Sequence, residues 1–210
     1  MRPEPIRLLA GLALFITACA ATAQTAVPLF NGTNLTGWKS VSFGGEGEVS
    51  VEKGELRLPA GAAMTGVAYT NKFPSDRYEL VVEAKKIDGN DFFATITFPV
   101  GTNFCSLVTG GWGGGVVGLS SVDGQDASEN ETTKYIKFER EQWYTFKIQV
   151  TPETISAWVD TNQVVKLPLA NRKISLRRGA IDLCKPLGLA SYQTTSSIRK
   201  IELRPLPEKQ

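Results

Sequence analysis

Apolar and polar residues alternate along most of the chain after residue 25, with the period of two that is typical of half-buried β-strands. The alternation is clearest at 78–85, where only Val81 departs from it, and at 143–150. Further strands are expected at 92–98, 155–159, 164–167, 187–192 and 198–203. Turn residues separate these segments, and no stretch keeps a helical spacing for three turns.

Many short strands of this kind predict an all-β fold, and their number favours an antiparallel two-sheet jelly-roll sandwich over a small barrel. We expect a single domain over residues 25–207, because no repeat or low-complexity linker interrupts the pattern. Two turns have the composition of hairpin connections: residues 88–91 between the strands at 78–85 and 92–98, and residues 160–163 between the next pair.

Residues 1–23 have the pattern of an export signal, with a charged start, an apolar run at 8–16 and small residues after it. The run is shorter than the roughly 20 residues of a membrane-spanning helix. Two cleavage interpretations remain open: ordinary secretion after Ala21–Ala23, or a lipoprotein signal ending before Cys19. The expected location is secreted, periplasmic or on the outer membrane or cell surface as a lipoprotein, with membrane contact only through that anchor.

Composition narrows the chemistry further. The sequence has no histidine and a formal net charge of +2, without a basic stripe, so nucleic acid is not an expected partner. Histidine-dependent triads and histidine-ligated metals are excluded, and proton transfer falls to Asp, Glu, Lys or Tyr. Cys105 and Cys184 form either a disulfide, which an oxidising compartment permits, or two separate buried thiols.

The glycine-rich segment Gly110–Gly115 surrounds Trp112. Glycines allow a ligand to approach the backbone closely, and an indole offers a flat apolar face for stacking on a sugar ring. The alternative is a tight strand crossing with Trp112 in the core. No phosphate-binding motif is present in this segment.

An acidic loop at residues 123–131 follows the glycine segment. Asp123, Asn130 and Glu131 are candidate ligands for sugar hydroxyls, and the density of oxygens makes calcium a candidate in a chain for which no other cofactor is expected. The alternative is a solvated turn whose side chains bind the backbone.

Three other side chains are candidates for a carbohydrate site. Glu83 lies on one face of its predicted strand, and Asp91 stands where a loop meets the next strand, so either can serve as a base. Trp158 points to the opposite face from Ala157 and Val159, either as a second sugar platform or as core. If Glu83, Asp91 and Trp112 act together, they must converge on one groove.

Several segments together resemble the 3-keto-disaccharide hydrolase domain family. The segment Leu29–Trp38, LFNGTNLTGW, is similar to the opening signature of the family. Weaker similarities follow at residues 54–56, 78–91, 142–144 and 157–160. The segment Asn90–Thr95 replaces the usual NSGIFFR, and Gly110–Ser121 replaces a hydrophobic-acidic segment of the family.

The resemblance implies a concanavalin A-like jelly roll that is exported and cleaves glycosides already oxidised at C3 of the sugar. In that chemistry a base removes the acidified C2 hydrogen, the anomeric leaving group is eliminated, and water adds back. Here the base is expected to be Glu83 or Asp91. The alternatives are a lectin-like carbohydrate-binding module without turnover, and an exported domain that binds another protein.

Overall fold

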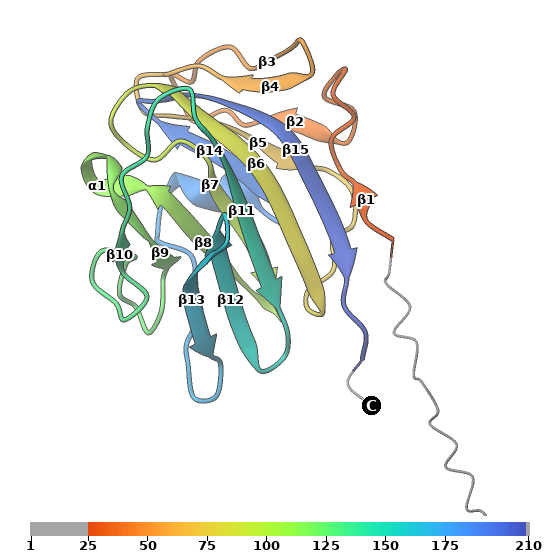
Figure 1. The fold of residues 1–210 in the computed structure, drawn as a ribbon, viewed down its shortest axis with the longest axis vertical. Coiled ribbons are helices and arrows are strands. Elements are labelled where there is room, and N and C mark those ends of the chain that lie inside the picture. Colours follow the sequence, from red (N-terminus) through yellow and green to blue (C-terminus); the bar gives the residue numbers. More distant parts are fainter. Residues whose placement is uncertain (1–24, 209–210) are drawn as a thin grey trace, which may run out of the picture.

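The computed structural model describes residues 25–208, which form two antiparallel β-sheets that face each other (Figure 1). The leader and its cleavage sites lie outside the described residues. Sheet I has the order β13-β12-β11-β6-β15-β4-β3, with β1 paired to β15, and sheet II has the order β10-β9-β8-β7-β14-β5-β2.

The strands of sheet I are β1 (Val27–Pro28), β3 (Ser50–Glu52), β4 (Glu55–Leu58), β6 (Tyr78–Asp88), β11 (Trp143–Val150), β12 (Thr154–Val159), β13 (Asn162–Pro168) and β15 (Thr195–Pro205). The strands of sheet II are β2 (Trp38–Ser40), β5 (Met64–Tyr69), β7 (Thr95–Val100), β8 (Asn103–Gly110), β9 (Val116–Ser120), β10 (Lys134–Tyr135) and β14 (Gly188–Tyr192). The two-layer arrangement confirms the predicted all-β jelly-roll sandwich.

Alternation along the strands builds the core between the sheets. In β11 every second side chain is buried, and Phe146 and Ile148 belong to the central apolar cluster together with Leu80 of β6 and Phe98 of β7. Burial of such side chains contributes about 1.5–3 kcal/mol each, which makes this layer the main stabilising feature of the fold.

The second predicted hairpin is confirmed, and the first is wrong. Strands β12 and β13 pair antiparallel around Asp160, whose φ of 53° is that of a tight turn. Strands β6 and β7 do not pair, because β6 lies in the centre of sheet I and β7 in the centre of sheet II. Residues 89–94 cross between the sheets, and the periodicity could not reveal this, since both strands bury one face in the same core.

The outer face of sheet II carries small side chains. Ala190 of β14 lies opposite Thr95 of β7 and Gly66 of β5, and Gly188 lies opposite Thr97. A 3-10 helix, η1 (Ala180–Cys184), covers one end of this face. A Cβ on Gly188 would lie 2.6 Å from Cys184 Cβ, so only glycine allows η1 to pack here.

Both cysteines of the domain are free thiols. Cys105 lies on β8 in the core, and Cys184 lies at the end of η1. Burial raises the pKa of each thiol to about 12. The sequence left open a disulfide or two separate buried thiols, and the structure contains two separate buried thiols. Within residues 25–208, no helix is both long and apolar enough to cross a membrane.

Candidate functional site

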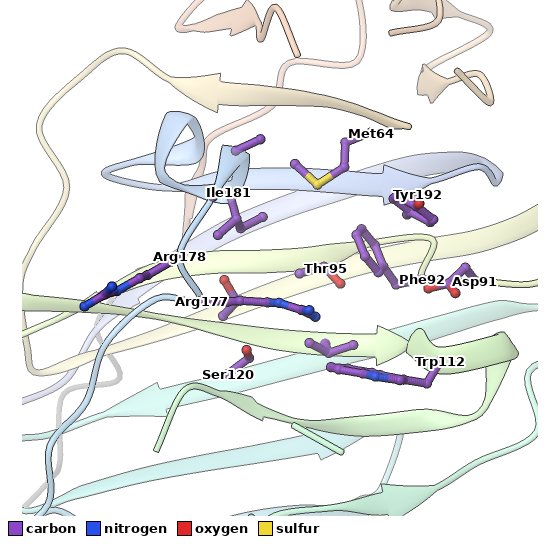
Figure 2. A pocket seen from close by; sticks show the side chains of 14 residues that line it. Met64, Asp91, Phe92, Thr95, Trp112, Ser120, Arg177, Arg178, Ile181 and Tyr192 are labelled. Carbon is purple, nitrogen blue, oxygen red and sulfur yellow. Dashed lines mark hydrogen bonds between the residues drawn. The ribbon is translucent and has the colours of Figure 1, made fainter. Parts of the chain in front are cut away.

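A pocket of about 360 Å³ lies on the outer face of sheet II (Figure 2). Five strands contribute its floor and walls, and the β6–β7 crossing, the β8–β9 turn, the segment before η1 and the start of η1 complete it. The lining residues are Met64, Asp91, Phe92, Thr95, Ser106, Val108, Trp112, Ser120, Arg177, Arg178, Gly179, Ala180, Ile181 and Tyr192. The pocket combines aromatic faces, hydroxyls and charges, as a polar ligand with apolar ring faces requires.

Asp91 stands at one end of the pocket, beside Phe92 and Tyr192 (Figure 2). Its Oδ1 accepts a hydrogen bond from the Phe92 backbone N–H at 2.8 Å, and its Oδ2 accepts one from Gly113 N–H at 3.3 Å. Its own backbone N–H donates to Thr194 Oγ1 at 3.1 Å. These contacts hold the carboxylate in the β6–β7 connection, where the chain passes from one sheet to the other.

Trp112 lies in the turn that joins β8 to β9, labelled α1 (Gly111–Gly114) at the left edge of Figure 1. This segment is not a regular helix, because Trp112 has a φ of 49° and Gly113 a φ of 86°. Gly110 has a φ of 84°, and a Cβ there would lie 3.1 Å from Gly114 O, so a larger residue is strained at this position. The result is an indole that is 45% exposed at the pocket rather than packed in the core.

Hydroxyl groups line the floor of the pocket. Ser106 lines the pocket, and its hydroxyl is paired with that of Thr97, which does not line it; their oxygens are 3.0 Å apart. Thr95, one step along the same face of β7, is 3% exposed, and its Oγ1 has no hydrogen-bond partner among the described residues. An unsatisfied buried hydroxyl costs about 1–3 kcal/mol, so Thr95 is a candidate for bonding a ligand.

Arg177 and Arg178 line the pocket from the segment that precedes η1. The Arg177 guanidinium lies over the Trp112 ring, 5.7 Å from its centroid, and its Nε is 3.3 Å from Asp126 Oδ2. Asp126 is itself held by the Ser120 hydroxyl at 2.9 Å. In Figure 2, Arg178 lies at the end of the pocket opposite Asp91.

Glu83 and Trp158 are not brought to this pocket. Both are on the outer face of sheet I, since their neighbours along each strand face the core. Glu83 lies 2.7 Å from Arg199 Nε and 3.7 Å from Lys200 Nζ. Trp158 is neither core nor pocket: it is half-buried, with Lys147 Nζ 4.2 Å above its ring. The expected convergence therefore holds for Asp91 and Trp112 but not for Glu83.

The acidic loop organises its own backbone. The Asn130 amide donates to the carbonyls of Leu119, Gln125 and Asp126, and its Oδ1 accepts from Thr132. Asn130 is buried by these contacts and does not line the pocket.

The other two candidates of the loop, Asp123 and Glu131, both pair with Arg172. The Lys173 backbone N–H and the Arg172 guanidinium hold the pKa of Asp123 below its usual value. Among the residues that the structure describes, no group of three or more Cys, Asp or Glu side chains is arranged to hold a metal ion. Calcium binding at this loop stays a prediction.

Sequence reasoning missed most of the pocket. Arg177 and Arg178 lie in an irregular segment without periodicity, and their adjacency to Gly179 was the single local signal. Thr95 belongs to a polar position of the predicted strand at 92–98, where the pattern does not distinguish a covered face from a solvated one, and no strand was predicted around Ser106. Their role depends on which segment packs over sheet II.

Several solved structures of known proteins share this fold. The apo Crh5 transglycosylase matches with a TM-score of 0.59 and 12% identity, covering 89% of this chain and 86% of that chain. A carbohydrate binding module, CBM66 from Bacillus subtilis, matches at 0.52 and 13%, covering 81% and 97%. The VIP36 exoplasmic/lumenal domain in its Ca²⁺/Man3GlcNAc-bound form matches at 0.55 and 10%, covering 86% and 91%. At these identities the similarity shows the fold alone.

The fold is thus a jelly-roll sandwich, shared with these three proteins. Within this class, the family model of the 3-keto-alpha-glucoside-1,2-lyase-like domain matches residues 25–204, and the chain belongs to that family. This confirms the resemblance found in the sequence. A search of curated proteins gave no match.

Proposed function

We propose that the protein cleaves glycosides oxidised at C3 of the sugar, by elimination followed by hydration, in the pocket on sheet II. The observation that carries this proposal is that Asp91 and Trp112 line the same pocket. Among the described residues that line it, Asp91 is the single carboxylate. Membership of the 3-keto-alpha-glucoside-1,2-lyase-like family supports this substrate class.

The proposed reaction begins with proton transfer. The ketone at C3 acidifies the C2 hydrogen, and the Asp91 carboxylate removes it as general base. The electron pair of the C2–H bond passes into an enolate, whose oxygen accepts a hydrogen bond from the free hydroxyl of Thr95.

Elimination then re-forms the ketone. The enolate electrons make a C1–C2 double bond, the C1–O bond breaks, and the leaving alcohol receives the proton that Asp91 took from C2, which restores the carboxylate. Water adds across the double bond, with its oxygen at C1 and a proton at C2, and yields the free 3-keto sugar. Trp112 positions the ring by stacking, which lowers the entropic part of the barrier.

The alternative is a lectin-like module that binds sugars without turnover. Both oxygens of Asp91 accept backbone hydrogen bonds, which is also what a purely structural carboxylate does. Trp112 and the hydroxyl floor serve binding equally well under this alternative.

One experiment separates these functions. The mature protein is incubated with a 3-keto-glucoside and with 3-keto-trehalose, and release of the keto sugar is followed by NMR while binding is measured by calorimetry. We expect release that depends on protein concentration, and binding of the intact substrate without release would assign the lectin-like function. A result with no binding and no release would contradict both functions. We also propose export to the periplasm or cell surface, which fractionation of the producing cells tests directly.

A further inference from the structure

The positive charges of the pocket are not needed by the proposed elimination. Arg177 and Arg178 line it together, whereas Asp91 is the single carboxylate among the described lining residues. The two arginines come from the segment before η1, and Arg178 stands at the end of the pocket opposite Asp91 (Figure 2). Arg178 therefore places one positive charge at the end away from the base, while the Arg177 guanidinium lies over Trp112, nearer to Asp91.

Arg178 has no ion pair within residues 25–208 and is exposed to solvent. Several other arginines of the domain are paired, such as Arg199 with Glu83 and Arg204 with Glu79 on sheet I, and neither of these lines the pocket. An unpaired guanidinium that lines a pocket has all its donors available, in a geometry that fits two oxygens of an anion.

Arg177 is held in place by one edge only. Its Nε faces Asp126, which the hydroxyls of Ser120 and Ser121 bind at 2.9 and 3.2 Å. The Trp112 ring supports the plane of the guanidinium. The terminal nitrogens make no hydrogen bond within the described part of the chain, so the group is positioned in advance with donors to spare.

From this geometry we propose that the natural ligand is an anionic glycan, whose carboxylate or sulfate is bound by Arg178, with the Arg177 guanidinium over Trp112 as a second positive contact along the sugar. The proposal rests on the proposed function, since it places the reacting ring near Asp91 and the charged substituent toward Arg178. Thr95, buried and unpartnered on the floor between them, is available to a sugar hydroxyl or carbonyl. The ligand class is thus a uronate-containing or sulfated disaccharide rather than a neutral one.

The test compares matched ligands. Binding of a neutral disaccharide, the corresponding aldobiouronic acid and the corresponding 6-O-sulfate is measured by calorimetry in 50 mM and in 500 mM NaCl. We expect at least one of the anionic sugars to bind about tenfold or more tightly at low salt, with the advantage reduced at high salt. The two anionic ligands distinguish a carboxylate from a sulfate.

Variants locate the effect. Arg178→Gln and Arg177→Gln are each expected to lower affinity for the preferred anionic sugar by about tenfold and to change affinity for the neutral sugar less than twofold. Arg199→Gln, on the outer face of sheet I, is the matched control and should change neither the affinity for the anionic sugar nor that for the neutral sugar. Because Arg178 has no ion pair to lose, its replacement does not threaten folding.

The result that would overturn the proposal is equal affinity for neutral and anionic sugars, or an anionic preference that survives both pocket substitutions. Equal affinity together with cleavage of neutral 3-keto substrates would leave the proposed function intact. Absence of any binding and of any cleavage would contradict both proposals.

Discussion

Asp91 and Gly113 are joined by a hydrogen bond, with the Gly113 N–H 3.3 Å from Asp91 Oδ2. The two residues are separated by two strands of sheet II, yet the bond ties the β6–β7 crossing to the turn that carries Trp112. The candidate base and the candidate sugar platform are therefore not independent. This bond links the position of the carboxylate to the conformation of the turn.

Replacement of Trp112 by glycine should separate binding from stability. The residue has a φ of 49°, which glycine adopts without strain, so we expect the free energy of unfolding to change by no more than about 1 kcal/mol. Loss of the exposed indole should weaken sugar binding by about tenfold. Calorimetry and urea unfolding measure the two effects.

The matched control is Trp158→Ala, which removes a half-buried indole from the outer face of sheet I. It should leave sugar affinity unchanged. If Trp158→Ala weakened binding and Trp112→Gly did not, the sugar would bind to the other sheet.

Thr95→Val should stabilise the free protein and impair its function. The hydroxyl of Thr95 is buried without a partner, so its removal should raise the free energy of unfolding by about 1 kcal/mol, while affinity or turnover falls. Thr97→Val, on the same face of β7, removes a satisfied hydroxyl and should instead destabilise the protein by about 1 kcal/mol. A destabilised Thr95→Val would mean that the hydroxyl already has a partner in the free protein.

The buried thiols predict a fall in stability at alkaline pH. Burial raises the pKa of Cys105 and Cys184 to about 12, whereas thiols of the unfolded chain ionise near 8.5. Between these values the unfolded chain loses protons that the folded chain keeps, so stability declines by up to about 1.4 kcal/mol per pH unit for each thiol. Below about pH 8 the contribution is constant.

Urea unfolding at pH 8 and pH 10 measures this dependence against a variant with both cysteines replaced by alanine. The stability advantage of the natural chain over the variant should shrink as the pH rises, because other titrating groups are common to both. An advantage that is independent of pH would contradict burial of the thiols.

Much of the fold was predictable from local patterns. Strand β11 coincides with the alternation at 143–150, and the hairpin at Asp160 follows from its turn residues. In both cases a single face is buried and the partner strand is close in sequence, so local chemistry determines the structure. The sheet switch after Asp88 depends instead on competition among distant strands, which no local pattern encodes.

The site was predictable only where a residue type stands out. Trp112 and Asp91 were identified because an indole among glycines and a carboxylate at the start of a strand are unusual in themselves. Glu83 was identified from its place on one face of a predicted strand, but it pairs with Arg199, 116 positions away in the chain, on the sheet that does not form the pocket. Arg178 has only the adjacent Gly179 as a local signal, because its position depends on how η1 packs over Gly188.

The most direct test of the account compares Asp91→Asn with Glu83→Gln in cleavage of a 3-keto-glucoside under saturating substrate. Asparagine can still accept the Phe92 hydrogen bond but cannot take a proton, so we predict a loss of about 10²–10⁴-fold in kcat with the fold retained. Glu83→Gln should retain the natural rate. Full activity of Asp91→Asn, or loss of activity in Glu83→Gln alone, would contradict the assignment of catalysis to the sheet II pocket.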